Sequence, residues 1–437
     1  MTDANENEIR SQLVRWGGQL LPFRERSETM KKGLKTGLFT TAAILSAMIA
    51  AQMPAQASGP GVIPSNFAAA GAAAPTYGAA AEIISYTDLV HRSYDAAYKK
   101  SVTMQKAINA FLANPNDKTL AAARKSWLDA HIVYSYTEAY RFYQGPIDFA
   151  KNKEGDEGPE GRLNAWPLNE AFIDYTKGDP KSGIINDTSI KISQKSIRDR
   201  DQVSDEADVT TGFHAVEFLL WGQDLSATGP GARPASDYKK GDAIKDRRRL
   251  YLTTVTDGIV EDLLWLSAQW DMNNGKVYVK DFVALDQRDA LGRILTGMAT
   301  LAGSELSTER MSVALDSGDQ EDETSCFSDN THNVYKADQQ SIANVYFGEY
   351  GDWKGSGIQA LIARVDPALE KQVTAQFNKT TASIAAIPHP IDRLLATPKG
   401  SAERKKMEAA VADLQEEAKL IIEVGKKLGL NITVAKE

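Results

Sequence analysis

The amino-acid sequence predicts an all-α protein built from two antiparallel helical bundles packed side by side. Apolar side chains recur every three or four residues over long segments, which is the spacing of one face of an α-helix. Segments in which apolar and polar residues alternate, as they do in strands, are scarce. The chain has 437 residues, which is too long for one ordinary core and favours two bundles.

The N-terminal region has the pattern of a secretory signal peptide. Basic residues at 31–35 precede an apolar run at 38–51, and Ala55-Gln56-Ala57 follows. We therefore expect export, with cleavage after Ala57 and a start at Met30, so that 1–57 comprises an upstream segment and the signal peptide. Residues 58–81 are rich in Gly, Pro and Ala, which is typical of a flexible tether.

The first bundle is expected over residues 82–225. Helical periodicity marks four segments, and Asn114-Pro115 stops the first of them. The expected helices are 84–112, 117–143, 169–175 and 212–221.

The second bundle is expected over residues 226–437. Three glycines and two prolines between 222 and 237 indicate the boundary. The expected helices are 245–270, 284–315, 335–347, 358–377 and 402–428, with an acidic loop at 316–333.

Composition excludes some classes of partner. The formal net charge is −8 and the pI is about 5.4, so the chain lacks the basic surface that nucleic acid requires. Cys326 is the single cysteine, which rules out an intramolecular disulfide. Its thiol is either a small buried apolar group or a ligand.

A half-polar stripe of side chains runs along one face of the second expected helix. Its members are spaced by three or four residues and therefore share one helical face: Trp127, His131, Tyr134, Glu138 and Arg141. This face is either exposed to solvent or lines a polar cavity between helices.

His214 and Glu217 are three residues apart on an expected helix, so both side chains can reach one point. Imidazole and carboxylate together suit zinc, iron, manganese or copper. No second His-x-x-Glu, Glu-x-x-His or His-Glu-x-x-His exists in the chain, which disfavours a symmetric di-metal centre and a zinc-protease motif. From spacing alone the pair is either a structural ion pair or a pair of ligands.

The acidic loop holds Cys326, Asp329 and His332 at spacings of three. These three side chains are compatible with metal ligation, and a solvated acidic loop is the alternative. The residue order of an EF-hand calcium loop is absent.

Several motifs together resemble the imelysin-like family. The segment 212–222 is similar to its Gly-x-His-x-x-Glu signature, and the stretch 317–332 is similar to the branch called iron-regulated protein A. Companion segments are 137–143, 145–148 and 164–170. The resemblance implies two helical bundles with the His-x-x-Glu pair near their junction. It also implies a periplasmic or outer-membrane-associated protein linked to iron acquisition, in a family with some members named peptidases.

The resemblance implies a metal site at His214 and Glu217, with Glu138 and Asp148 completing it. Arg141 and Glu170 lie in matching motifs and are expected to line the same cleft. Further candidates for that cleft are His131, Cys326, Asp329 and His332. Iron, ferrous or ferric, is the expected ion, and zinc is the alternative.

Three functions are compatible with these residues. The first is a periplasmic iron-binding protein that serves iron uptake or homeostasis, with a membrane iron transporter or an outer-membrane component as partner. The second is a metallopeptidase that uses the His-x-x-Glu site. The third is a non-catalytic interaction module in which the pair is structural.

Overall fold

A computed structural model describes residues 67–69, 76–150, 157–226 and 228–434. All of them belong to one compact unit, residues 56–437. The signal peptide expected within residues 1–57 lies outside the described residues. No helix within the described ranges is long and apolar enough to cross a membrane.

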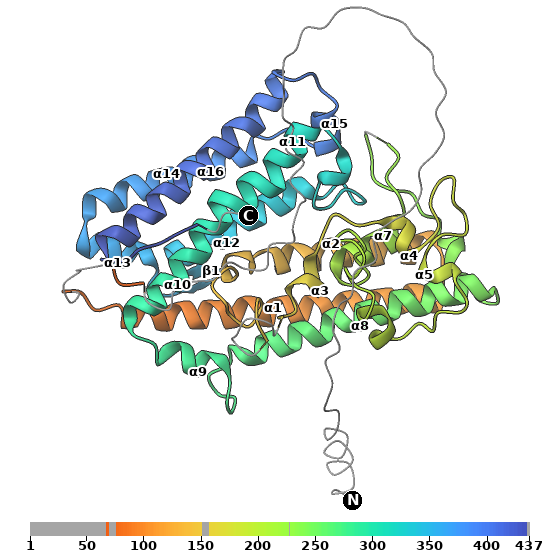
Figure 1. The fold of residues 1–437 in the computed structure, drawn as a ribbon, viewed down its shortest axis with the longest axis horizontal. Helices are drawn as coiled ribbons and strands as arrows, with labels where there is room; N and C mark the ends of the chain where they lie inside the picture. The colour runs from red at the N-terminus through yellow and green to blue at the C-terminus, as the bar shows by residue number, and fades with distance from the viewer. Residues whose placement is uncertain (1–66, 70–75, 151–156, 227, 435–437) are drawn as a thin grey trace, which may run out of the picture. The chain divides into compact units, whose positions relative to one another are not determined.

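The described part of the chain is helical, as predicted, with one short two-stranded sheet (Figure 1). A first group of helices packs around α1. Its members are α1 (Ala80–Ala113), α2 (Asp117–Ser135), α7 (Gly212–Trp221) and α8 (Ala243–Gln269). The connection between α1 and α2 is short, and the side chain of Asn116 caps α2 by accepting from the N–H groups of Lys118 and Thr119.

A second group packs around α16. Its members are α10 (Gln287–Thr300), η4 (Leu301–Ser312), α11 (Val313–Ser317), α12 (Thr331–Phe347), α13 (Ile358–Val365), α14 (Pro367–Ala385) and α16 (Ala402–Lys427). α12 also packs against α2 and the short helix η2 (Glu138–Tyr140), so it joins the two groups.

Shorter elements connect these helices. They are α3 (Glu160–Asn164), α4 (Glu170–Ile173), α5 (Gly183–Asn186), α6 (Gln194–Arg198), η3 (Ala235–Tyr238), α9 (Tyr278–Val283), η5 (Gln320–Asp322), α15 (Ile391–Leu395), β1 (Glu349–Tyr350) and β2 (Trp353–Lys354). β1 and β2 pair antiparallel.

At two of the expected segment limits, the structure shows contacts that cross the limit. The expected boundary at residue 225 precedes α8, whereas α8 packs against α1 and α7 of the first group. Within the expected tether, Phe67 is buried and its carbonyl accepts from the N–H of Asn431. The division of the chain into domains stays a prediction.

The helix expected over 117–143 is shorter than predicted, because α2 ends at Ser135. The N–H and the hydroxyl of Thr137 both donate to the carbonyl of Tyr134, which turns the chain out of the helix. Glu138 therefore lies in η2 and Arg141 in extended backbone. The half-polar stripe is not one helical face, but its members from Trp127 to Glu138 are buried.

Two further helices differ from the simple periodic pattern. Most of the C-terminal half of the helix expected at 284–315 is the π-helix η4, which is wound more loosely than an α-helix. The helix expected at 358–377 breaks at Asp366-Pro367, where Asp366 caps α14 and Pro367 takes its first position.

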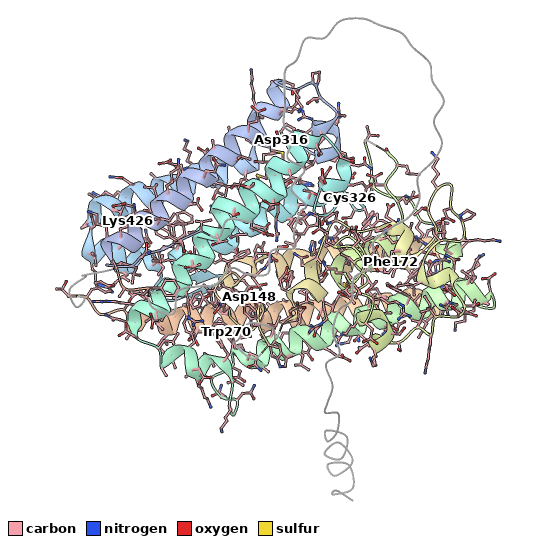
Figure 2. The ribbon with its side chains drawn as sticks, viewed as in Figure 1. Asp148, Phe172, Trp270, Asp316, Cys326 and Lys426 are labelled. Atoms are coloured by element: carbon pink, nitrogen blue, oxygen red, sulfur yellow. The ribbon has the colours of Figure 1, made fainter. Side chains whose placement is uncertain are left out.

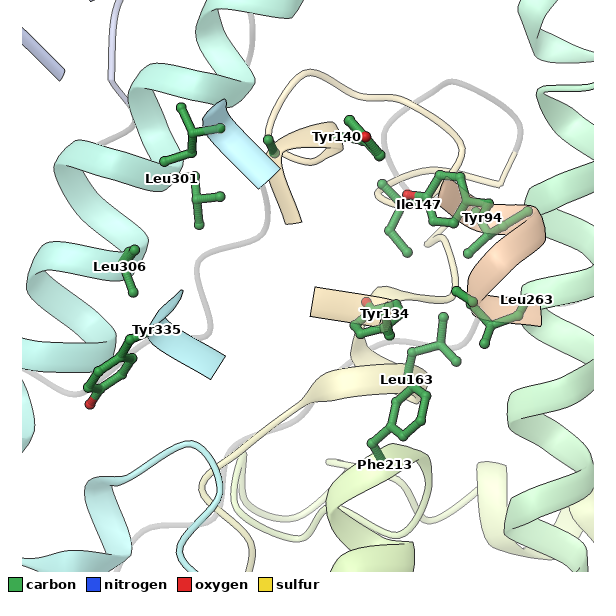
Figure 3. Close-up of a cluster of buried hydrophobic side chains, with 14 of the residues drawn as sticks. Tyr94, Tyr134, Tyr140, Ile147, Leu163, Phe213, Leu263, Leu301, Leu306 and Tyr335 are labelled. Atoms are coloured by element: carbon green, nitrogen blue, oxygen red, sulfur yellow. The ribbon is translucent and has the colours of Figure 1, made fainter. Parts of the chain in front are cut away.

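One continuous core of buried side chains spans both groups (Figure 3). The rings of Tyr134 and Phe213 pack against each other at a tilt within it, with centroids 5.2 Å apart, which sets α7 against α2. Gly212 begins α7 with φ at +82°, a conformation that other residues rarely adopt. A Cβ there would lie 2.6 Å from the carbonyl oxygen of Leu163 in α3, so glycine is also needed for close packing.

Replacing Gly212 with alanine should destabilise the protein more than the backbone strain alone, which is about 1–3 kcal/mol. Gly241→Ala is the matched control, since Gly241 has φ at +93° and open space around its Cβ position. Urea unfolding followed by circular dichroism measures both. Equal losses in the two variants would show that the contact with Leu163 is unimportant.

Candidate functional site

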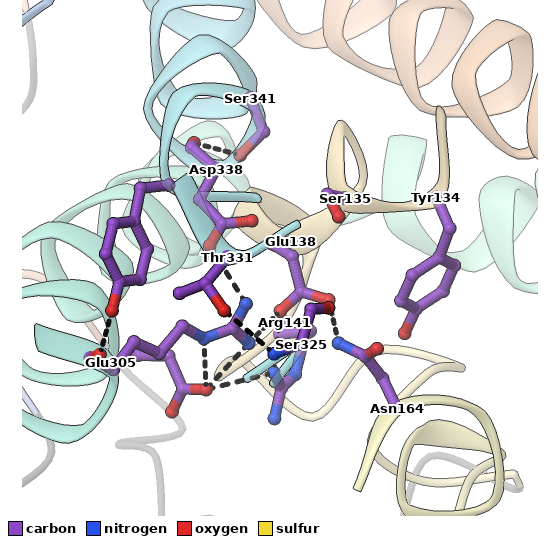
Figure 4. A network of polar contacts seen from close by, with 12 residues as sticks. Tyr134, Ser135, Glu138, Arg141, Asn164, Glu305, Ser325, Thr331, Asp338 and Ser341 are labelled. Atoms are coloured by element: carbon purple, nitrogen blue, oxygen red, sulfur yellow. Dashed lines mark hydrogen bonds and ion pairs between the residues drawn. The ribbon is translucent and has the colours of Figure 1, made fainter. Parts of the chain in front are cut away.

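Arg310 lies fully buried where the two groups of helices meet. Its acidic partners Glu138, Glu305 and Asp338 are labelled in Figure 4. Its guanidinium donates to Glu138 at 2.7 Å and to Asp338 at 2.9 Å. Two further bonds, at 2.8 and 3.0 Å, go to one oxygen of Glu305. Glu305 precedes Arg310 by five residues, and the i to i+5 bonding of the π-helix η4 accommodates this spacing. One side chain thus ties η4 to η2 and α12.

A second guanidinium, that of Arg141, shares Glu138 with Arg310 and adds Glu160 to the group. Arg141 donates to Glu138 at 2.7 Å and pairs with Glu160 at 3.1 Å. Burial raises the pKa of Glu138, but Arg310 and Arg141 outweigh that effect and hold the pKa below its usual value. Burial dominates at Asp338 and Glu160, whose pKa values rise to about 8 and about 7. Burial therefore disfavours a full negative charge on Asp338 and Glu160, which lowers the net charge that this buried group of residues carries.

Glu138 also orients a histidine. Its second oxygen accepts from the amide nitrogen of Asn164 at 3.2 Å, so the amide oxygen of Asn164 faces Nε2 of His131 at 2.9 Å. Because that oxygen can only accept, Nε2 of His131 carries the proton and Nδ1 keeps a lone pair. Burial lowers the pKa of His131 to about 4, which keeps the ring neutral.

His214 and Glu217 contact each other on α7, as their spacing predicted. Nδ1 of His214 lies 2.9 Å from one oxygen of Glu217. The other oxygen accepts from the backbone N–H of Ser328 at 3.0 Å and from its hydroxyl at 2.5 Å. The loop after η5 therefore reaches across to hold the His-x-x-Glu pair.

The rings of His131 and His214 meet edge to face, with centroids 5.1 Å apart. His214 is 2% exposed and Glu217 is fully buried. Burial lowers the pKa of His214 to about 3 and raises the pKa of Glu217 to about 8. Among the described residues, neither Nε2 of His214 nor Nδ1 of His131 has a hydrogen-bond partner. Buried polar atoms are normally paired, so these two nitrogens are candidates for a ligand.

Other residues that were predicted as metal ligands or for the cleft make different contacts. Asp148 accepts from the N–H groups of Phe142 and Tyr143 at 3.3 Å each, and Glu170 accepts from Gln223 at 2.6 Å. Cys326, labelled in Figure 2, is buried, and burial raises its thiol pKa well above the usual value. His332 stacks on His389 with centroids 4.2 Å apart.

Asp329 belongs to another group of carboxylates. Asp224, Asp329 and Asp392 each place one carboxylate oxygen within 4.8 Å of the other two. In the described ranges, no other set of three or more His, Cys, Asp or Glu side chains does so. The metal-ligand set expected around His214 stays a prediction.

Sequence reasoning missed several residues that hold this site. Asn164 and Glu160 gave no spacing signal because they act from a separate short helix, α3. Glu305 and Arg310 are five residues apart, which does not match the face of an α-helix. Ser328 was missed because the candidate ligands in its loop were Cys326, Asp329 and His332.

Removing the Arg310 guanidinium should cost about 3–5 kcal/mol of folding free energy, because it leaves buried carboxylates without their counter-charge. Arg310→Met preserves most of the side-chain volume, and the exposed Arg393→Met is the control, with an expected change below about 0.5 kcal/mol. The midpoint and slope of urea unfolding measure both. A loss below about 1 kcal/mol for Arg310→Met would contradict a structural role for this network.

Comparisons with known proteins agree with this architecture. The imelysin family model matches residues 90–421. Iron-regulated protein A of Synechococcus elongatus is 23% identical over 333 residues, which cover 74% of this chain and 80% of that protein.

Two solved structures share the fold. A putative iron-regulated protein A precursor from Parabacteroides distasonis has a TM-score of 0.62 at 20% identity, covering 82% of this chain and 97% of that one. An imelysin-like protein from Psychrobacter arcticum has a TM-score of 0.58 at 14% identity, covering 83% and 100%. The family model spans well over half of the sequence, and this chain belongs to the imelysin family.

Proposed function

We propose that this protein is an exported iron-binding protein that takes part in iron uptake or homeostasis and holds the ion at His214. The observation that carries the proposal is the unpartnered Nε2 of His214, among the described residues, on a ring held through Nδ1 by Glu217. A carboxylate bound to one imidazole nitrogen orients the other toward a metal and raises its basicity.

The residues fit a metal ion. Both His214 and His131 are neutral at physiological pH, and a metal requires the neutral imidazole. Nδ1 of His131 would supply a second nitrogen, and Glu217 would orient His214. Imidazole ligands suit iron and also zinc, so ligand chemistry alone leaves zinc as the alternative. Iron is favoured by the names of the Synechococcus elongatus and Parabacteroides distasonis proteins.

Glu217 couples metal binding to proton release. With a pKa near 8, Glu217 holds a proton at neutral pH and can donate it to Nδ1 of His214, which leaves the ring proton on Nε2. Binding at Nε2 displaces that proton, and the ionised Glu217 then accepts from Nδ1. One proton leaves for each metal ion bound.

Burial favours ion binding over peptide cleavage. The family includes peptidases by name, but a peptide bond would have to reach His214, which is 2% exposed, and Glu217, which is fully buried. Glu217 is also occupied by Ser328 and His214. An ion needs far less access than a peptide.

The location and partner extend the proposal. The basic and apolar segments that precede Ala57 support export to the periplasm. A periplasmic iron-binding protein would deliver its ion to a membrane iron transporter or receive it from an outer-membrane component.

Glu217→Gln should weaken iron binding by about 10–100-fold. Ser328 donates to one oxygen of Glu217, so the glutamine would keep its oxygen there and turn its NH₂ toward Nδ1 of His214. That arrangement fixes the ring proton on Nε2 and blocks the ligand atom.

Calorimetric titration of chelator-treated protein with ferrous iron under anaerobic conditions, and separately with zinc, measures this effect. His214→Ala should lose binding, and His91→Ala on α1 is the control that removes an imidazole elsewhere. Unchanged binding in both Glu217→Gln and His214→Ala would overturn the proposal. Peptide hydrolysis lost in Glu217→Gln would favour the peptidase instead.

The affinity should also depend on pH in a defined direction. Because Glu217 must lose a proton that it holds below about pH 8, metal affinity should rise about tenfold per pH unit between about pH 6 and 8. Titrations in two buffers of different ionisation enthalpy measure the proton release directly. A flat profile, or an affinity that falls as pH rises, would rule out this coupling.

A further inference from the structure

A second group of acidic side chains lies outside the His214 site. Asp224 follows α7, Asp329 lies in the loop before α12, and Asp392 lies in α15, and one oxygen from each is within 4.8 Å of the other two. Glu323 lies beside them, since the charges of Asp392, Asp329 and Asp224 all raise its pKa after the larger effect of burial. We call these four residues the carboxylate cluster.

Three members of the cluster are buried, Asp329 is partly exposed, and none of the four has a counter-charge among the described residues. Asp392 is 4% exposed and Glu323 is 2% exposed, and their carboxyl groups face each other. Apart from the Thr331 hydroxyl beside Glu323, no side-chain donor among the described residues satisfies their oxygens. Asp224 and Asp329 each leave one further oxygen unpartnered within the same ranges. None of the ion pairs found in the described part of the chain involves any of the four. Burying several carboxylates together is costly unless a cation compensates them.

From these observations we propose that the carboxylate cluster binds a hard divalent cation, with calcium as the best-fitting ion. All the offered ligand atoms are carboxylate oxygens, the donors that calcium, magnesium and manganese prefer. Three atoms within 4.8 Å of one another share a point at most about 2.8 Å from each, close to the calcium–oxygen range of about 2.3–2.6 Å. Calcium accepts a flexible arrangement of carboxylate ligands, whereas magnesium demands a near-ideal octahedron, so an irregular set of side chains favours calcium.

The bound cation would also fix a loop that serves the first site. Asp329 directly follows Ser328, whose N–H and hydroxyl hold Glu217. Asp224 follows the C-terminal end of α7, and Asp392 lies in a third segment of the chain. A cation between them joins these three segments. The cluster does not share a residue with the proposed iron site, so the two proposals can fail separately.

Calcium added to the chelator-stripped full-length chain at about pH 8 tests the proposal. Calorimetry should show binding at up to about 1 mM calcium, and the melting temperature should rise with calcium concentration. Asp392→Asn should weaken calcium binding by at least about tenfold. In chelator the same variant should melt above the unsubstituted protein, because one of the repelling charges is gone.

Two controls separate this site from other effects. Asp316→Asn makes the same change of charge at an exposed position in α11 and should leave calcium binding unchanged. His214→Ala should also bind calcium normally, which distinguishes this site from the iron site. No calcium binding by the unsubstituted protein, or binding that survives in Asp392→Asn and Asp329→Asn, would overturn the proposal.

Discussion

The rest of the structure depends on the buried guanidinium of Arg310. Its bonds to Glu138, Glu305 and Asp338 join η2, η4 and α12, and so connect the two groups of helices through charge-assisted hydrogen bonds. A buried arginine is stable only when most of its donors are satisfied, which fixes the relative positions of these three elements. The π-helix η4 meets this requirement by bringing Glu305 and Arg310 together.

The ion pairs of Arg310 also determine how the histidines are oriented. Glu138 can orient Asn164 because Arg310 and Arg141 keep it ionised, and Asn164 in turn selects the tautomer of His131. Glu217 holds His214, and Ser328 in the loop between η5 and α12 in turn holds Glu217. The site is therefore preorganised by hydrogen bonds that reach both groups of helices. Among the described residues, Nε2 of His214 and Nδ1 of His131 are left without a partner and are available to a ligand.

Helical periodicity was sufficient to predict the fold class and the His-x-x-Glu helix, because long amphipathic segments and the residues that stop them are local signals. It failed where tertiary contacts override local pattern. The turn at Thr137 and the π-helix at Leu301–Ser312 moved Glu138, Arg141 and Arg310 off the faces that α-helical spacing assigns. Asn164 and Ser328 were unpredictable from spacing, because their roles come from contacts between distant segments. The resemblance to a family placed most candidates near one another, but it could not distinguish a ligand from a residue that orients one.

The proposed iron site requires that His214 present a metal-binding nitrogen that Glu217 holds in place. Anomalous diffraction at the iron edge, from crystals of the iron-loaded protein, shows where the ion lies. We expect an anomalous peak at bonding distance from Nε2 of His214, with Glu217 still bonded to Nδ1. A peak confined to the carboxylate cluster, or no peak beside either histidine, would contradict that expectation.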